Sequence, residues 1–139
     1  MVQLVQMPTA EEALAALYHT LGEGAKYRPE ITDIVNYMRE HLGEAMSLHS
    51  MAARANLSAN YFSNLFTQQT GRSFVSYLNQ MRLEQAQMLL KDGDMTIQEV
   101  AWQCGFPNAS YFNRIFRRMV GMSPGRWRSV KGRRANDEG

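Results

Sequence analysis

An internal repeat is the feature of this sequence that most restricts the fold. A Tyr-Phe pair, a Phe four residues after it and a Gly-x-Ser group run through Tyr61–Ser73 and again, fifty positions later, through Tyr111–Ser123. Just upstream the offset is forty-nine, and the matched residues there are Leu48, Met51 and Ala52 with Ile97, Val100 and Ala101. The second copy therefore has one extra residue in its turn. Repetition of both segments predicts a duplicated architecture.

The second copy, Thr96–Trp127, reads as a short helix, a tight turn and a second helix. Thr96 and Glu99 have the spacing of a capping box, in which each side chain accepts a hydrogen bond from the other residue's backbone amide. Gly105 suits the sharp bend, and Pro107 has a backbone preset for the start of the next helix. Two short helices joined in this way are a helix-turn-helix candidate.

The second helix of that copy has an apolar and a polar side. The residues expected to be buried are Tyr111, Phe112, Ile115, Phe116 and Met119, and those expected to stay polar are Asn108, Ser110, Asn113, Arg114, Arg117 and Arg118. Gly121 is expected to end the helix. A recognition helix that enters a DNA groove needs a polar, basic open face of this kind.

The order of residues over both copies resembles the DNA-binding domain of the AraC/XylS family. The shared pattern is L..MA....LS..YFS.LF....G.SF..YL...RL..A..LL in the first copy and I..VA...GF...SYF.R.F....G.SP..W in the second. The resemblance covers about Glu30 to Arg128, or about 99 of 139 residues. The leading segment ITDIVNYMREHLGEAMSL is also similar to the C-terminal output domains of YesN-type response regulators.

The expected fold is all-α, with two helix-turn-helix subdomains joined by a long central helix. We expect residues 1–28 to form a connector helix (Ala10–Leu21) and a linker, although a lid packed on the domain is the alternative for this helix. The DNA-binding domain is expected at 29–129, with a bracing helix over Glu30–Leu42, the first helix-turn-helix at about 47–70, the linker helix at about 74–91 and the second helix-turn-helix at about 96–120. Residues 130–139 are expected to be a disordered basic and polar tail.

The charge of the chain is unevenly distributed. The formal net charge is only +2, but residues 58–139 hold eleven basic and six acidic side chains, and 111–134 holds eight basic side chains and no acidic one. A basic end suits contacts with DNA phosphates, which supply most of the non-specific affinity. A solvated basic tail is the simpler interpretation for Lys131–Arg134 alone.

Other classes of function find little support in the residues. A single cysteine, Cys104, excludes an internal disulfide and a cysteine-based zinc cluster, and we expect it to be a small buried apolar residue. The three histidines do not stand at metal-binding spacing, and a nucleophile triad or phosphate-cradling loop is missing. No run approaches the ~18 apolar residues of a membrane span. We therefore expect neither an enzyme nor a cofactor, no membrane association, and a cytoplasmic location.

The residues expected to read DNA bases lie on the outward faces of the two recognition helices. In the first helix, where the inward set is expected to be Tyr61, Phe62, Leu65 and Phe66, they are Asn60, Ser63, Asn64 and Thr67. In the second helix they are Ala109, Ser110, Asn113 and Arg114. Arg114 is the strongest candidate because an arginine can bond guanine O6 and N7 together. A phosphate contact or a surface ion pair is its alternative. The first helix is uncharged from Ser58 to Thr70, which predicts modest specificity from it.

The resemblance to the family also implies phosphate contacts at helix N-termini, where free amides face the DNA backbone. We expect further phosphate contacts at basic side chains near the second recognition helix. The set is Ser47, Ser58, Thr96, Asn108, Arg117, Arg118, Arg126 and Arg128. Arg82 matches a characteristic arginine of the family's connecting helix, and we expect a structural or backbone-supporting role for it. Trp102 faces away from the apolar stripe, so it either packs on a neighbouring helix, which we favour, or contacts a partner.

We therefore expect a sequence-specific regulator that binds double-stranded DNA by placing two recognition helices in successive major grooves. The resemblance implies an activator that contacts RNA polymerase. Because no receiver or cupin-like sensor is visible in the sequence, we expect signal sensing to lie in a missing N-terminal sensor or receiver domain or in a partner. The alternative is a helical protein-interaction module whose basic face binds an acidic partner.

Overall fold

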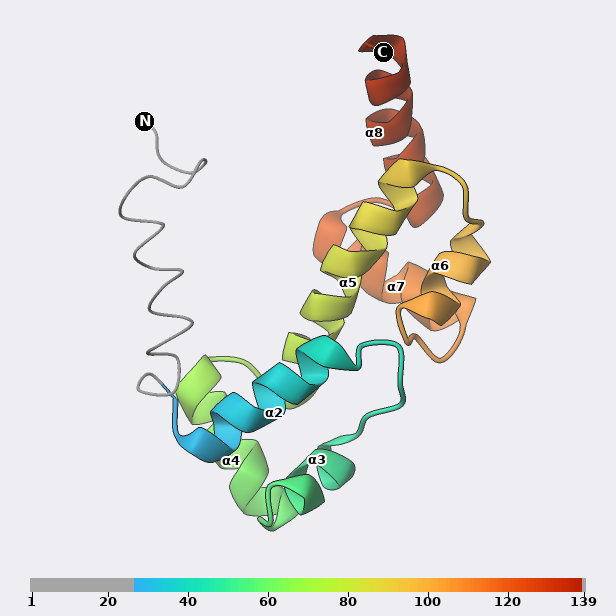
Figure 1. The fold of residues 1–139 in the computed structure, drawn as a ribbon. Helices are drawn as coiled ribbons and strands as arrows, with labels where there is room; N and C mark the ends of the chain where they lie inside the picture. Colours follow the sequence, from blue (N-terminus) through green and yellow to red (C-terminus); the bar gives the residue numbers. More distant parts are fainter. Residues whose placement is uncertain (1–26, 139) are drawn as a thin grey trace, which may run out of the picture. The chain divides into compact units, whose positions relative to one another are not determined.

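The computed structural model describes the backbone of residues 27–138 and the side chains of residues 27–131. The predicted connector helix, Ala10–Leu21, lies outside the described residues. Within them the chain forms the helices α2 (Pro29–Glu40), α3 (Leu48–Arg54), α4 (Ala59–Thr70), α5 (Phe74–Asp92), α6 (Ile97–Gln103), α7 (Ala109–Val120) and α8 (Pro124–Glu138) (Figure 1). The predicted all-α fold with two helix-turn-helix segments is confirmed.

The helices divide between two compact units. The first contains α3, α4 and most of α2, and the second contains 38–47 and everything from Phe74 onward. Helix α2 thus begins in the first unit, and its last turn belongs to the second. In the first unit α3 packs against α4, and in the second α5 packs against α6 and α8 while α7 packs against α6 and α8.

The repeat seen in the sequence is reproduced by the ends of the helices. Ser58 caps α4 by accepting the amide of Tyr61, and fifty residues later Asn108 caps α7 by accepting the amide of Tyr111. Both helices end at a glycine in the left-handed region, Gly71 with φ 80° and Gly121 with φ 101°. A glycine at this position terminates a helix without steric cost. The two copies therefore share start and stop signals.

The extra residue of the second copy is Pro107. In the first copy the turn residue Asn56 has φ 61°, and Leu57 donates its amide to Ala52 O. In the second copy Gly105 has φ 93°, and Phe106 donates its amide to Ala101 O, at the unchanged offset of forty-nine. The N-cap Ser58 follows directly after Leu57 in the first copy, whereas one residue stands between Phe106 and the N-cap Asn108 in the second. Pro107 fills that place and is exposed.

The core of the first unit is built from one side of each of its helices. The rings of Phe62 and Phe66 on α4 pack with centroids 5.7 Å apart and are fully buried. The other buried apolar residues are Ile31, Ile34 and Val35 of α2, Met51 and Ala52 of α3, and Leu65 of α4. Burial of each large side chain contributes about 1.5–3 kcal/mol, which stabilises helices too short to form alone.

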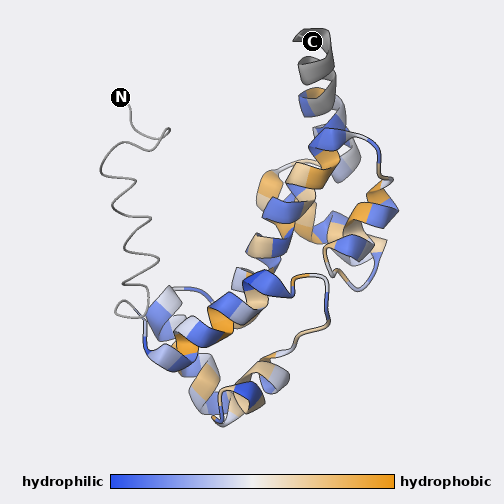
Figure 2. Ribbon diagram, in the orientation of Figure 1, coloured by the Kyte–Doolittle hydropathy of each residue, from blue (hydrophilic) through white to orange (hydrophobic). Residues whose placement is uncertain are grey.

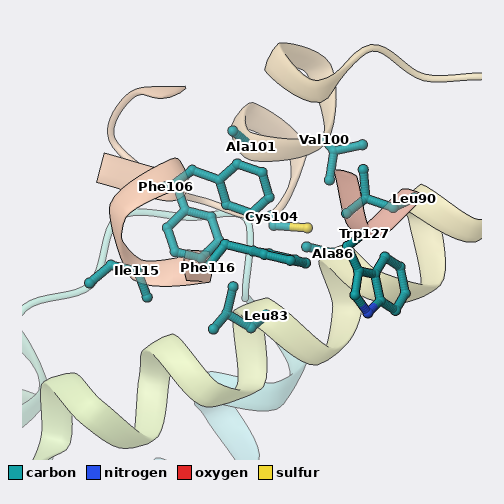
Figure 3. Close-up of a cluster of buried hydrophobic side chains, with 11 residues drawn as sticks. Leu83, Ala86, Leu90, Val100, Ala101, Cys104, Phe106, Ile115, Phe116 and Trp127 are labelled. Atoms are coloured by element: carbon teal, nitrogen blue, oxygen red, sulfur yellow. The ribbon is translucent and has the colours of Figure 1, made fainter. Parts of the chain in front are cut away.

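The second unit has a larger aromatic core (Figure 3). Phe112 packs between Phe106 and Phe116, at centroid distances of 4.9 and 5.6 Å, and Phe116 meets Trp127 edge-on at 5.9 Å. The remaining members are Leu83, Ala86, Leu90, Val100, Ala101, Cys104 and Ile115. Residues from α5, α6, α7 and α8 meet in this cluster, so it fixes the orientation of α7.

Arg82 fastens the segment after α2 to α5 within the second unit. Its Nε donates to Leu42 O at 3.0 Å and its Nη2 donates to Glu44 O at 2.7 Å. The side chain is buried, and desolvation lowers the pKa of its guanidinium. The two carbonyls nevertheless give its Nε and Nη2 donors hydrogen-bond acceptors. This arrangement requires a glycine at position 105, because a Cβ there would collide with Leu42 O and the Arg82 guanidinium. The expected structural role of Arg82 is confirmed.

Some expectations about exposure are wrong. The backbone of α8 continues to Glu138, and Trp127 near its start lies in the core. Trp102 does not pack on a neighbouring helix, because 79% of it is exposed. Tyr61 and Met119, expected to be inward, are 46% and 38% exposed.

The helices are amphipathic rather than uniformly apolar. Figure 2 shows hydrophobic and hydrophilic residues alternating around α2 and α5. Among the described residues, no helix is both long and apolar enough to cross a membrane. Charged and polar faces are therefore available for contact with a polar partner.

Candidate nucleic-acid interface

The outward face of α4 is polar and uncharged. The expected base-reading residues Asn60, Asn64 and Thr67 are exposed, and Ser63 is half-buried. They share the helix with Phe62, Leu65 and Phe66, all buried. The expected division of α4 is therefore correct except at Tyr61. Its exposed hydroxyl accepts a hydrogen bond from Arg28 Nη1 at 3.3 Å.

The outward face of α7 is basic. Ser110 and Arg114 are exposed, and so are Arg117 and Arg118 one turn further on. Phe112, Ile115 and Phe116 hold the opposite side in the core. The guanidinium of Arg114 lies 5.2 Å from the centroid of the Tyr111 ring, within the range of a cation–π contact.

The two remaining candidates on α7 are less open than expected. Ala109 and Asn113 are half-buried, and Asn113 Nδ2 donates to Ala109 O at 2.9 Å. This bond within the helix uses one of the donors with which Asn113 would read a base. A bidentate contact with adenine needs both an amide donor and the amide oxygen, so Asn113 must turn its remaining groups outward.

The caps at the starts of α4 and α7 leave donors for an anion. Ser58 and Asn108 use their side-chain oxygens to accept the amides of Tyr61 and Tyr111, at 3.1 and 2.8 Å. The Ser58 hydroxyl hydrogen and the Asn108 amide group can still donate. Because helix N-termini carry partial positive charge, both ends suit a phosphate.

The N-terminus of α6 is less suitable. Thr96 and Glu99 form the predicted capping box, with bonds of 2.9 and 3.0 Å. The carboxylate of Glu99 therefore already lies at this helix end, where it would repel a phosphate. Ser47, at the corresponding end of α3, is exposed.

The basic residues of α8 have different roles. Arg126 is exposed, and its backbone amide bonds to Ser123 Oγ at 3.2 Å. Arg128 instead turns inward, donates from Nε to Leu90 O at 3.0 Å and buries Nη2. Arg128 thus joins α8 to the end of α5, and its Nε is not available to a phosphate.

The sequence analysis missed a polar residue behind the recognition helix. Asn79 on α5 is only 6% exposed and donates from Nδ2 to the hydroxyl of Tyr111 at 3.1 Å. Burial of Asn79 could have been predicted from the sequence, because it stands four residues before the buried Leu83 and seven before Ala86. Helical spacing places all three on one face. The polar side chain concealed this pattern.

Two helix-turn-helix modules with matching caps define the chain as a tandem helix-turn-helix protein. A family model described as a helix-turn-helix domain matches residues 51–129. The regulator YijO of Escherichia coli is 40% identical over 95 residues, which are 68% of this chain and 34% of that protein. The transcriptional activator RhaR of Klebsiella pneumoniae is 48% identical over 63 residues, or 45% of this chain and 22% of that one.

Solved structures agree with this similarity. The DNA-binding domain of AdpA, determined in complex with a target DNA, is 35% identical with a TM-score of 0.72, and the match covers 75% of this chain and 94% of that one. The C-terminal domain of AraT, a response regulator from Geobacillus stearothermophilus, is 30% identical with a TM-score of 0.70, over 73% and 85% of the two chains. The chain belongs to the AraC/XylS family of helix-turn-helix proteins.

The relatives are named as transcriptional regulators and not as enzymes. The match to these curated relatives includes 68% of this chain but only about a third of their own length. The described residues likewise hold no cluster of three or more His, Cys, Asp or Glu side chains that would bind a metal.

Proposed function

We propose that this chain binds double-stranded DNA in a sequence-specific manner and regulates transcription from the bound site. The observation that carries the proposal is the basic face of α7, where Arg114, Arg117 and Arg118 are exposed on a helix whose other side is held in the core. Membership of the AraC/XylS family and the DNA-bound structure of AdpA's domain support it.

The base-reading role is assigned to α4 and α7. In α7, Arg114 reads a guanine, Ser110 and Asn113 contact neighbouring base edges, and Ala109 offers a methyl contact. In α4 the readers are Asn60, Ser63, Asn64 and Thr67. Since α4 has no charged side chain from Ala59 to Thr70, its contribution comes from hydrogen bonds, many through water, rather than from ionic contacts.

Phosphates are held by Arg117, Arg118 and Arg126 and by the N-termini of α4 and α7. The capping geometry of Ser58 and Asn108 supports this assignment because both leave donors exposed. Ser47 and Thr96 are weaker members of the set, since α3 and α6 have only seven residues each and Glu99 already occupies the end of α6.

The finer proposals concern the whole regulator. Relatives named as activators support activation through contact with RNA polymerase. The similarity to a response regulator's C-terminal domain supports a sensor or receiver domain in the part of the protein outside this sequence. The exposed Trp102 is a candidate for a protein contact. A cytoplasmic location follows from the proposed function.

Selection of bound fragments from random duplex DNA, followed by footprinting, tests the proposal. Two protected segments about one helical turn apart, or roughly 10 base pairs, are expected if both recognition helices enter the major groove. Failure to enrich any sequence, together with no protection, would reject DNA reading and favour binding of an acidic protein partner.

A further inference from the structure

Tyr111 is held at three points in the second unit. Its backbone amide donates to Asn108 Oδ1 at 2.8 Å, its ring packs on Phe106 at a centroid distance of 6.2 Å, and its hydroxyl accepts from Asn79 at 3.1 Å. Asn79 is buried on α5 and Tyr111 is half-buried, so the contact is partly shielded from solvent. The ring consequently has little freedom to rotate.

The exposed guanidinium of Arg114 lies over this fixed ring. Residues three apart on a helix share a face, and the 5.2 Å distance from Arg114 Cζ to the ring centroid brings the charge within reach of the π electrons. This contact links a buried residue of α5, through Tyr111, to a predicted base reader.

The first copy is built differently at the matching positions. Tyr61, fifty residues before Tyr111, is 46% exposed, and its hydroxyl accepts from the exposed Arg28 at 3.3 Å. Asn64 stands where the second copy has Arg114. The part-buried Asn79–Tyr111 bond and the arginine over the ring thus occur together in the second copy.

We propose that Asn79 and Tyr111 are positioning residues that orient Arg114 for discrimination of one base pair. The proposal rests on the proposed function, since it assigns Arg114 a base to read. Arginine has large rotamer entropy, and its fork recognises guanine only when both donors are aligned. Restricting the guanidinium before binding lowers the ordering cost of the specific complex. On other sequences the side chain gains nothing from this alignment.

The test uses the full 139-residue chain and a duplex carrying its selected site. The base pair read by Arg114 is defined as the position at which Arg114→Ala loses discrimination. Binding is then measured on four duplexes that differ only there. Tyr111→Phe keeps the ring but removes the hydroxyl. The double variant Tyr111→Phe/Asn79→Leu removes both polar partners, so no buried donor is left unsatisfied and stability is preserved. Tyr61→Phe is the matched control.

Discrimination between the preferred base pair and the other three is expected to fall about three- to tenfold in both Tyr111 variants, a part of the full bidentate contribution. Binding to scrambled DNA should change less than about twofold, and Tyr61→Phe should retain full discrimination at this base pair. In an Arg114→Ala background, Tyr111→Phe should remove no further discrimination, because the group that it orients is gone.

An unchanged discrimination ratio in the double variant would overturn the proposal, and so would equal losses on all four duplexes, since a purely structural role lowers affinity without regard to sequence. These outcomes differ from failure of the proposed function, in which the unaltered chain selects no sequence at all. If the chain selects a site but Arg114→Ala loses discrimination nowhere, Arg114 reads no base, and the positioning role is rejected with it.

Discussion

At the scale of single residues, the least replaceable position is Gly105, in the turn after α6. Its φ of 93° is unfavourable for any residue with a Cβ, and a Cβ would also collide with Leu42 O and the guanidinium of Arg82. The Leu42 oxygen belongs to the backbone and Arg82 is held by two hydrogen bonds, so neither can move cheaply. Gly121 has a similar φ of 101° but open space around it.

Gly105→Ala is expected to destabilise the second unit by about 3 kcal/mol or more, since it combines backbone strain with a collision. Gly121→Ala should cost only the backbone strain, about 1–2 kcal/mol. Urea unfolding of both variants measures the difference. Equal shifts would mean that the collisions with Leu42 O and Arg82 add nothing to the requirement for glycine.

The surroundings of Cys104 disfavour the reactive thiolate form of its side chain. It is fully buried beside the aromatic cluster, and burial raises the pKa of its thiol from 9.0 to about 11. The folded state therefore disfavours the thiolate, which is the reactive form. Above pH 9 the unfolded chain loses this proton first, so the thiol's contribution to stability is complete below pH 9 and is lost between pH 9 and about 11.

The folded protein is expected to react with a chromogenic thiol reagent at pH 8 at least ~100-fold more slowly than the urea-unfolded chain. The reason is that a thiol pKa of about 11 in place of 9.0 lowers the thiolate population about 100-fold. Since Cys104 is the single cysteine, the signal is unambiguous. Rapid labelling of folded protein would show that the turn after α6 opens readily.

At the scale of elements, α4 and α7 have the same architecture but different chemistry. Both have twelve residues, a side-chain cap and a left-handed glycine end. Yet α4 has no charged side chain, whereas α7 has Arg114, Arg117 and Arg118. The two helices are therefore expected to contribute differently to binding, with α7 supplying most of the ionic affinity.

Within α7 the position of each arginine sets the effect of its loss. Arg114→Ala is expected to cost about 1–3 kcal/mol and to relax preference at one base pair, because a base contact is removed. Arg117→Ala should weaken binding to all sequences similarly, as a phosphate contact would. Competition binding on cognate and scrambled duplexes separates them, and equal losses on both for Arg114→Ala would refute its base-reading role.

The sequence predicted these elements well where a local signal exists. Caps, glycine stops and apolar spacing lie within a few residues of the helix that they define, as at Thr96, Asn108 and Gly121. It predicted less well where a partner distant in sequence decides. The Asn79–Tyr111 bond spans 32 residues and the bond from Arg128 to Leu90 spans 38, so neither side chain's orientation could be read from its neighbours. The exposure of Trp102 likewise depends on which helices cover α6.

At the scale of the whole molecule, the small net charge of +2 understates the expected electrostatic contribution to binding. Opposite charges in the two halves of the chain cancel in the sum, but Arg117, Arg118 and Arg126 are exposed together on or beside the second recognition helix. Salt dependence reports phosphate contacts and not net charge, so it should be steep.

Replacing Arg117, Arg118 and Arg126 by Gln is expected to reduce the slope of log K against log salt by about 2.7 in magnitude, or about 0.9 for each phosphate that is no longer neutralised. Lys91→Gln, an exposed residue at the end of α5 outside the proposed interface, is the control and should leave the slope unchanged. A slope that the triple variant does not alter would place the phosphate contacts elsewhere.

The second unit is not contiguous in the chain, since residues 38–47 belong to it although α3 and α4 intervene before Phe74. A cut at residue 73 would therefore remove the carbonyls of Leu42 and Glu44 and leave the Arg82 guanidinium buried without acceptors. A fragment of residues 74–139 is expected to fold poorly alone and to recover when a peptide of residues 38–47 is supplied, as its circular dichroism would reveal. The two units interleave along the chain, so no single scission separates all residues of one unit from all residues of the other.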